Sequence, residues 1–374
     1  MYIKNIELKD FRNYEKLSLE FHKKVNILLG DNAQGKTNLL EAIYITSLGK
    51  SFRTTRDNEM IRFGEEFCRV KITADKDEEN LIVELVISEK GKAIKIDGVK
   101  AKKASDLLEH IYIVVFSPED LKIVKDEPEK RRRFIDRELC QLKPSYYNLL
   151  SDYKKVLHQR NAYLKENVID ESALDIWDIK LSEYGSKIML QRVEFVEKIQ
   201  KISSKIHKKI TDEKELLKIT YEPSVKLVQM EDIQNYRNYN ALRAQKEYFQ
   251  ETLKETKRGD LYNRNTSKGP HKDDLRISIN GIDIRHFGSQ GQQRTAALSL
   301  KLSEIKLIKE ETGENAVLLL DDVLSELDNS RQNFLINAFE DVQLFITTTA
   351  LTEGVKKALP EGKNFYVNNG YIKE

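Results

Sequence analysis

The hydrophobic pattern near the start of the chain predicts strands that lead into a glycine-rich loop. Residues 17–21 alternate between apolar and polar side chains, which is typical of a strand with one buried face. The almost continuously apolar run 25–29 ends at Gly30, as expected for a strand buried on both faces. After Thr37 the apolar spacing becomes helical, as Leu39, Leu40, Ile43 and Tyr44 show.

More strands are predicted before the middle of the chain. Residues 67–99 contain the alternating segments of a β meander, which ends near the Asp97-Gly98 turn. Residues 111–116 form a further apolar run, and Ser117-Pro118 stops it. A sheet-rich first third of the chain follows from these patterns.

From about residue 135 to 260 the pattern is dominantly helical. Apolar residues recur every three or four positions among many Lys and Glu, which is typical of amphipathic helices. Alternating Leu217, Ile219 and Tyr221 interrupt this pattern before a second helical stretch.

Strand signals return in the last third of the chain. Residues 275–279 alternate before an Asn280-Gly281 turn, and a helix is predicted over about 290–310. The apolar runs 317–320 and 344–346 predict two further buried strands.

These segments predict an α/β lobe that a helical insertion divides in sequence. The first lobe comprises residues 1–135 and 262–374, and the mostly helical lobe comprises residues 136–261. A length of 374 residues agrees with two lobes, each large enough to bury a core.

Charge, cysteine content and hydropathy limit which kinds of partner and compartment the chain suits, but they identify no particular partner. The 63 basic and 61 acidic residues leave a net charge of +2, so a nucleic-acid partner would need a local basic patch. Cys68 and Cys140 form no CxxC pair, which fits a reducing compartment without a disulfide framework. The absence of an 18-residue apolar run and of an apolar signal segment predicts a cytoplasmic protein with no membrane partner.

The glycine-rich loop has the GxxxxGK[ST] pattern of a P-loop between a strand and a helix. Its residues are Gly30, Asp31, Asn32, Ala33, Gln34, Gly35, Lys36 and Thr37. Backbone N–H groups and a helix N-terminus at such a loop favour phosphate, so ATP is the predicted cofactor. We expect Lys36 to reach the β and γ phosphates and Thr37 to ligate Mg²⁺. The alternative is a glycine turn with a surface lysine.

Two carboxylates follow the apolar run 317–320. Asp321 is predicted to hold Mg²⁺, since parallel α/β sheets place their chemistry at the carboxyl ends of strands. Asp322 points the other way and is predicted to position the attacking water. The alternative, which does not exclude that role, is that Asp322 caps the following helix.

Two further segments indicate which class of P-loop protein this chain resembles. Residues 321–328 resemble the Walker B motif and D-loop of ABC-type ATPases, and residues 287–294 resemble their signature loop in its SMC-like variant. That resemblance implies an ABC-type head in which Ser289, Gly291 and Gln292 of one subunit close over the γ-phosphate held by another. Without it, Ser289 is a candidate N-cap of the helix that begins near residue 290.

Several motifs together resemble the RecF family, the bacterial recombination-mediator ATPases. They are residues 35–44, 51–53, 116–121, 131–136, 158–161, 269–275 and 321–328 with the signature loop, and they span essentially the whole chain in order. The resemblance implies an ABC-type P-loop ATPase head with a β-rich subdomain and a shorter helical lobe. It also implies binding to single-stranded or gapped/duplex DNA, ATP-dependent homodimerisation, slow DNA-stimulated hydrolysis, and cooperation with RecO and RecR in repair, replication restart and SOS induction. The chain shows no base-reading motif such as a zinc finger, so DNA binding is expected to be independent of sequence.

The chain departs from transport-type ABC ATPases at three places. Asp322 replaces the Glu that follows their Walker B Asp, and the run 347–349 consists of threonines where they carry a switch His. No Q-loop glutamine is evident, and residues 116–121 are the candidate for that place. A shorter carboxylate without an imidazole favours slow hydrolysis. Lys272 stands where the RecF motif usually has Arg, which keeps the charge without bidentate geometry.

Four basic clusters are candidates for DNA contact by phosphate neutralisation. They are residues 130–133, 154–155, Lys205 with Lys208 and Lys209, and Lys254 with Lys257 and Arg258. The alternative for each is a solvated helix face with ion pairs one turn apart. For residues 131–133, anchoring the junction between the lobes is a further alternative.

Other P-loop classes fit the motifs less well. An SMC-type chromosome protein would need longer coiled-coil arms than the insertion 136–261 supplies. A transporter subunit would show the switch His and a plain Q-loop, and a small-molecule kinase or GTPase would not need the loop at Ser289 or the D-loop.

Overall fold

The computed structural model describes residues 1–229, 239–337, 342–351 and 353–374 of the chain. Contacts divide these residues into two units, one of Met1–Lys122 with Ala297–Glu374 and one of Ile123–Ala296. Each unit is described by itself below.

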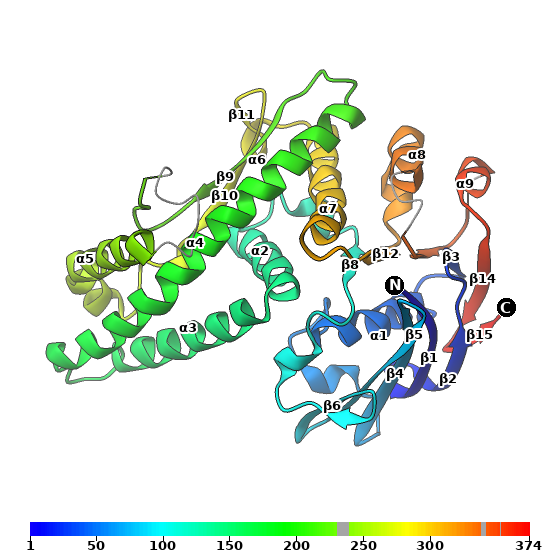
Figure 1. Ribbon diagram of the computed structural model, residues 1–374, viewed down its shortest axis with the longest axis horizontal. Helices are drawn as coiled ribbons and strands as arrows, with labels where there is room; N and C mark the ends of the chain where they lie inside the picture. The colour runs from blue at the N-terminus through cyan, green and yellow to red at the C-terminus, as the bar shows by residue number, and fades with distance from the viewer. Residues whose placement is uncertain (230–238, 338–341, 352) are drawn as a thin grey trace. The chain divides into compact units, whose positions relative to one another are not determined.

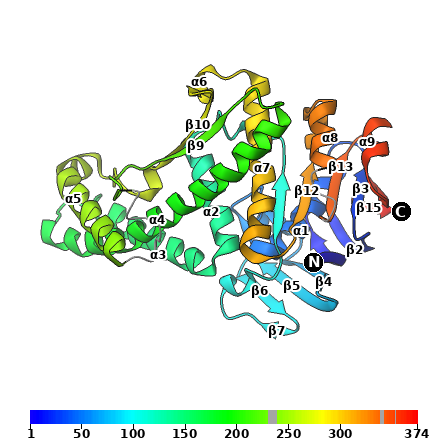
Figure 2. The same cartoon turned by 45° about the horizontal axis from the view of Figure 1, so that its top comes forward.

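The first unit contains a largely parallel sheet that holds the predicted P-loop strand. Its order is β15-β14-β3-β13-β12-β8, and only β15 is antiparallel to its neighbour. The strands are β3 (Val25–Leu29), β8 (Ile113–Phe116), β12 (Val317–Asp321), β13 (Leu344–Thr348), β14 (Gly362–Asn368) and β15 (Tyr371–Lys373). Figures 1 and 2 show β12 near β3, with β13 pairing between them. The apolar runs predicted as buried strands are therefore confirmed.

A second, antiparallel sheet in the same unit has the order β2-β1-β4-β5-β6-β7. Its strands are β1 (Tyr2–Phe11), β2 (Tyr14–Glu20), β4 (Phe67–Lys76), β5 (Glu79–Ser88), β6 (Gly91–Ile96) and β7 (Val99–Lys100). Buried and accessible positions alternate along β4 and β5, as the predicted meander requires. Helix α1 (Lys36–Leu48) contacts strands of both sheets, which explains why almost all of its side chains are buried.

The remaining short elements of this unit surround the parallel sheet. They are η1 (Asp57–Met60), η2 (Ala104–Leu107), η3 (Asp120–Lys122), η6 (Val323–Glu326), α8 (Asn329–Asn337) and α9 (Glu353–Ala358). Helix α7 (Gln290–Thr312) belongs to both units, because the division falls within it. Among the described residues, no helix combines the length and the apolar character that crossing a membrane demands.

The second unit is mostly helical, as predicted for the insertion. Its helices are α2 (Pro128–Leu142), α3 (Pro144–Tyr163), α4 (Glu171–Ile210), α5 (Tyr239–Asn263), η5 (Pro270–Lys272) and α6 (Ile284–Phe287). Helix α4 is 40 residues long and packs on α3, on α5 and on strand β9. Figure 1 shows these helices running beside one another.

A three-stranded sheet completes the second unit. Its order is β11-β10-β9, from β9 (Leu217–Glu222), β10 (Asp274–Ile279) and β11 (Ile282–Asp283). Asn280 and Gly281 both have positive φ, 50° and 83°, in the predicted turn between β10 and β11. The fold class is thus an ABC-type α/β head with a β-rich part and a helical lobe, and the boundary of that lobe at residues 136–261 stays a prediction.

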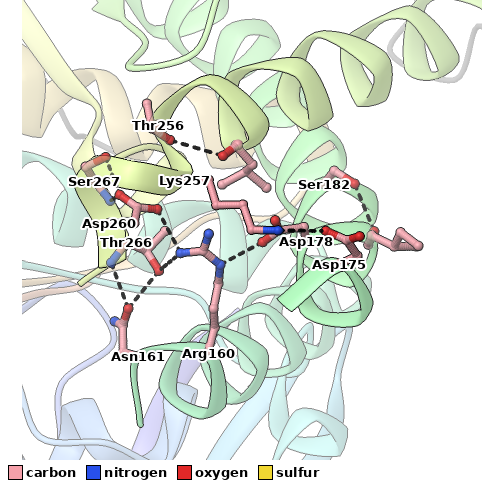
Figure 3. A network of polar contacts seen from close by, with 12 residues as sticks. Arg160, Asn161, Asp175, Asp178, Ser182, Thr256, Lys257, Asp260, Thr266 and Ser267 are labelled. Carbon is pink, nitrogen blue, oxygen red and sulfur yellow. Dashed lines mark hydrogen bonds and ion pairs between the residues drawn. The ribbon is translucent and has the colours of Figure 1, made fainter. Parts of the chain in front are cut away.

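One buried arginine joins three helices of the second unit (Figure 3). Arg160 of α3 is fully buried, and its guanidinium donates to Asp178 of α4 at 2.7 Å and to Asp260 of α5 at 2.8 Å. It also donates to the Thr266 hydroxyl at 2.9 Å, and that hydroxyl donates to Asn161 at 2.7 Å. The motif at residues 158–161 is therefore explained by packing of the helical lobe.

His271 lies in a second buried cluster of the same unit. Its Nε2 faces the Thr266 carbonyl at 3.0 Å, and a carbonyl can only accept, so Nε2 carries the proton. Nδ1 then accepts from the Tyr153 hydroxyl at 2.7 Å. Burial lowers the pKa of His271 to about 4, and the nearby cations Lys272, Arg132 and Arg192 act in the same direction.

This pKa predicts acid destabilisation. The unfolded chain binds a proton near the ordinary histidine pKa of 6.5, whereas the folded chain does so only near 4. The contribution of the neutral ring is therefore present above pH 6.5 and is lost as the pH falls from 6.5 toward 4, by about 3 kcal/mol at most. Urea unfolding of the wild type and of His271→Gln between these pH values measures it. We expect the wild type to lose more stability across that window than the variant, and equal losses would contradict the assignment.

Candidate nucleotide site

The conformation of the phosphate loop requires its two glycines. Gly30 and Gly35 have φ values of 158° and 118°, and Ala33 between them also has a positive φ of 64°. A Cβ on Gly30 would lie 2.3 Å from the Val367 carbonyl oxygen, and one on Gly35 would lie 2.6 Å from the Asn13 side-chain nitrogen. The Val367 backbone therefore excludes a side chain at Gly30, and the positive φ disfavours one at both glycines.

Lys36 begins helix α1 and turns its ammonium group back toward the loop. Its Nζ donates to the carbonyl of Gly30 at 2.6 Å and to that of Asp31 at 3.2 Å. The residue is only 3% exposed, so its stem is held while the charge stays within the loop. This geometry places a cation where the loop N–H groups and the helix N-terminus also favour phosphate.

Gln34 joins the phosphate loop by hydrogen bonds to two other segments of the same unit, one at Asn13 and one at Asn369 and Gly370. Its side-chain oxygen accepts from the N–H of Asn369 at 2.7 Å, and its carbonyl accepts from the N–H of Gly370 and from Asn13, both at 3.1 Å. Gln34, which is predicted as a cofactor-binding position, thus also has a structural role in this unit. Asp31, Asn32 and Ala33 are exposed at the crest of the loop.

Thr37 and Asp321 meet although 284 positions separate them. The Thr37 hydroxyl donates to the Asp321 carboxylate at 2.7 Å, and Thr347 of the neighbouring strand donates to the same oxygen at 3.0 Å. Burial raises the pKa of the Asp321 carboxyl, and the two hydroxyl hydrogen bonds oppose that shift. A hydroxyl beside a buried carboxylate supplies the oxygen donors that Mg²⁺ prefers, so the two predicted metal ligands fit that ion.

The Asp322 side chain does not cap the short helix that follows it. Asp322 has a left-handed φ of 52° at the start of η6, and its side chain makes no capping hydrogen bond there. Its N–H donates to the Thr347 hydroxyl at 2.8 Å. The alternative in which the Asp322 side chain caps the following helix is therefore wrong, and the backbone strain is held by Thr347.

The three threonines that replace the switch His have different surroundings. Thr347 is fully buried beside Asp321, and the Thr348 hydroxyl donates to the Ala350 carbonyl at 2.7 Å. Thr349 lines a cavity of about 870 Å³ next to Gly30. That cavity lies between β3, β14 and the segment after β13, and its lining does not include Lys36, Thr37 or Asp321. Gly30, Asp31 and Gln34 of the phosphate loop do line it, so the cavity borders only one side of the predicted phosphate site.

A buried carboxylate behind the loop was not predicted from sequence. Glu41 of α1 is fully buried, and Arg12 donates to both of its oxygens at 2.7 Å. Arg53 lies 3.5 Å from Glu41 and donates to Asn38 at 2.6 Å, and its charge opposes the rise that burial causes in the pKa of Asp321. The motif at residues 51–53 was the available signal, because it placed a cation shortly after the P-loop helix.

The signature loop begins helix α7. The Ser289 hydroxyl accepts from the N–H of Gln292 at 3.2 Å, and the Gln292 side chain accepts from the N–H of Ser289 at 3.0 Å. This reciprocal pair is a capping box, so the N-cap alternative for Ser289 is confirmed. Ser289 and Gly291 are both exposed, which leaves the first turn of α7 open to solvent. The loop belongs to Ile123–Ala296, whereas the phosphate loop belongs to the other unit.

The first basic cluster, residues 130–133, includes one buried arginine. Arg131 is 1% exposed and binds both oxygens of Asp274, at 2.6 and 2.9 Å. Arg132 donates to the Asp273 carbonyl at 2.7 Å, and Arg133 forms an ion pair with Glu129 one turn away. Arg131 as a DNA contact is therefore wrong, because its charge is buried and compensated.

The parallel sheet, the glycine loop and the carboxylate at the end of β12 define a P-loop ATPase head of the ABC type. A solved SMC head bound to the C-winged helix domain of ScpA has the same fold, with a TM-score of 0.55 at 17% identity over 100% of this chain and 96% of that one. The sequence model of the family described as "RecF/RecN/SMC N terminal domain" matches residues 2–370.

More similar relatives show to which member of this wider family the chain corresponds. The DNA replication and repair protein RecF of Lachnospira eligens is 46% identical over 378 residues, which cover 100% of this chain and 99% of that protein. That of Clostridioides difficile is 45% identical over 375 residues, covering 100% and 98%. The chain belongs to the RecF family, and the predicted resemblance is confirmed.

Solved structures agree with this assignment. Two structures of the recombination mediator protein RecF in the RecFOR pathway, one named with ATPrS and one with ATP, are both 38% identical to this chain. Their TM-scores are 0.90 and 0.89, and the matches cover 99% and 100% of this chain and 97% of each structure.

Proposed function

We propose that this chain is an ATP-gated DNA-binding protein of recombinational repair, in which ATP drives dimerisation and slow hydrolysis reverses it. The observation that supports this most directly is the Thr37 hydroxyl 2.7 Å from the Asp321 carboxylate, together with the Lys36 ammonium that turns back into the same loop. Together they offer a cation for phosphate and oxygen donors for Mg²⁺.

Each residue of the nucleotide site has a role in this proposal. The N–H groups of Gly30 to Thr37 and the Lys36 ammonium bind the triphosphate, and Thr37 with Asp321 holds Mg²⁺. Asp322 positions the attacking water. Magnesium, when bound, neutralises charge that develops on the phosphate oxygens.

Slow turnover is supported by the groups around Asp321. Thr347 takes the place of an imidazole, and its hydroxyl is already engaged with Asp321 and with the N–H of Asp322. A threonine hydroxyl at this position is a weak proton acceptor, so ATP acts as a timed switch rather than as fuel for a motor.

The open first turn of α7 supports dimerisation through ATP. We propose that Ser289, Gly291 and Gln292 of one copy meet the γ-phosphate held by Lys36 of another copy. The RecF relatives of known structure carry the RecFOR pathway in their names. For this chain we propose RecO and RecR as partners, sequence-independent binding at DNA gaps, recombinase loading, and roles in replication restart and SOS induction.

Sedimentation tests the proposed switch. We expect the unmodified chain to sediment as a dimer with ATP and Mg²⁺ and as a monomer without nucleotide. Adding duplex DNA at two salt concentrations then reports ATP-dependent binding and its salt dependence. A monomer under all of these conditions would rule out the dimer mechanism.

Replacing Ser289 with arginine should separate ATP binding from dimerisation. The Lys36 loop lies in the other unit and keeps its ATP affinity, whereas a long cation at the exposed first turn of α7 blocks approach of a second copy. We expect ATP affinity within about threefold of the wild type and an ATP-dependent dimer weakened at least about a hundredfold, which corresponds to roughly 2.7 kcal/mol.

The matched control for this variant is Ser18→Arg, which places the same side chain on the exposed face of β2. Titration with a fluorescent ATP analogue and sedimentation measure the two properties separately. An unchanged dimer in Ser289→Arg would remove the signature loop from the interface.

A further inference from the structure

The last part of helix α4 presents four lysines to solvent on one side. Lys201, Lys205, Lys208 and Lys209 are all exposed, whereas Ile202, Ser203 and His207 of the same segment are buried. Spacings of four and three residues bring Lys201, Lys205 and Lys208 into one row, with Lys209 next to it. The row extends over about 12 Å at 1.5 Å per residue.

These four lysines differ from the other cations of α4, which are Lys180, Lys187, Arg192 and Lys198, in having no partner among the described residues. Lys198 is paired with Glu194 at 2.9 Å and Lys187 with Glu183 at 3.7 Å, as a solvated helix face predicts. Within the described part of the chain, the four side chains make no ion pair or hydrogen bond. Of the nearby acids, Asp212 is paired with Lys214, and Glu215 faces His207 and Gln292. Glu197 and Glu213 are the remaining ones.

The helix macrodipole explains only part of the pattern. It favours cations in the last turn of α4, which accounts for Lys208 and Lys209. Its effect falls off within one turn, so it does not account for Lys201 and Lys205. A row of solvent-exposed ammonium groups without neighbouring base-reading side chains instead fits a chain of phosphates.

The same segment of α4 is connected to the signature loop. On the buried side, His207 Nε2 lies 3.0 Å from Glu215, and the other oxygen of Glu215 accepts from Gln292 at 2.9 Å. Gln292 forms the capping box with Ser289. These contacts link the first turn of α7 through Glu215 to the turn of α4 that carries Lys208.

We propose that Lys201, Lys205, Lys208 and Lys209 bind the phosphate backbone of DNA, and that Glu215 couples this contact to the signature loop. This inference rests on the proposed function and assigns its DNA surface. Since lysine binds phosphate as a point charge, the contact discriminates little between sequences.

Charge reversal tests the surface. In Lys205→Glu/Lys208→Glu, DNA affinity at about 100 mM salt should fall roughly tenfold or more. The slope of log affinity against log salt should decrease by about 0.9 for each phosphate that is no longer neutralised. The control Lys16→Glu/Lys23→Glu changes the net charge equally at two exposed residues of the other unit. Thermal denaturation checks that each variant is folded.

The possible results distinguish a failure of the proposed lysine surface on α4 from a failure of the proposed DNA-binding function. If the wild type binds duplex DNA and the α4 variant matches the control in affinity and slope, the α4 surface is overturned. If the wild type fails to bind DNA with ATP and Mg²⁺, the proposed function itself fails.

Glu215→Gln tests the coupling. The amide retains the size of the side chain but replaces one of the two acceptor oxygens, which face His207 and Gln292, with an NH2 group that can only donate. We expect DNA affinity without nucleotide within about twofold of the wild type and loss of most of the increase that ATP produces. An intact ATP-dependent increase would overturn the coupling and leave the lysine surface standing.

Discussion

Lys36→Met is expected to lower ATP affinity at least about a hundredfold. The ammonium group lies 2.6 Å from the Gly30 carbonyl within the loop, where it can exchange carbonyls for phosphate oxygens. Two charge-assisted hydrogen bonds of about 1.5 to 3 kcal/mol each are then removed, and about 2.7 kcal/mol corresponds to a hundredfold change. Calorimetric titration with ATP and Mg²⁺ measures the loss of affinity.

Lys24→Met is the matched control, because Lys24 is exposed just before β3 and should leave ATP affinity unchanged. The variant Lys36→Met should also fail to form the ATP-dependent dimer in sedimentation, since no triphosphate is held for the second copy. An ATP affinity within about threefold of the wild type would show that the loop does not bind phosphate through Lys36.

Arg160→Met should destabilise the helical unit by about 3 to 5 kcal/mol. The substitution removes the cation between Asp178 and Asp260, which are 6% and 0% exposed, and leaves two buried carboxylates without their charge partner. Burial already raises the pKa of Asp178 against the opposing effect of Arg160, so losing that arginine favours its neutral form further. Urea denaturation followed by circular dichroism measures the change.

Arg133→Met is the control for this experiment. Its ion pair with Glu129 has a similar N–O distance, 2.6 Å, but both side chains are more than 60% exposed, so the expected cost is at most about 1 kcal/mol. Adding Asp178→Asn and Asp260→Asn to Arg160→Met should recover part of the stability, because the uncompensated charges disappear. Equal effects of Arg160→Met and Arg133→Met would show that the buried contacts of Arg160 do not stabilise the helical unit.

The strands that the sequence predicted are those with strong local patterns. The apolar run of β3 and the alternation of β4 and β5 were sufficient, because burial on two faces or one face leaves a direct mark on residue order. Strand β14 was missed. It buries only Phe365 and Val367, and its place in the sheet depends on parallel pairing with β3, which lies near the other end of the chain.

In the candidate site, too, the residues in local motifs were predicted, whereas their partners from distant segments were not. The spacing around Lys36 and Thr37 and the strand before Asp321 identified three residues that lie together in the structure. The position of Thr347 against Asp321 and the contacts of Arg12 with Glu41 could not be read from spacing, because side-chain partners are chosen by sheet order and burial.

Residue types at fixed local spacing were sufficient to predict the P-loop, the acidic end of β12, the helical middle of the chain and the RecF family. Only the tertiary structure distinguished the cations. In the sequence, the motifs that contain Arg131 and Arg160 do not differ from those of exposed cations. In the structure, both arginines are buried against carboxylates. Lys205 and Lys208 remain exposed and unpaired among the described residues. The free energy of a charge depends on desolvation and on partners brought from distant segments, and residue order alone does not specify either.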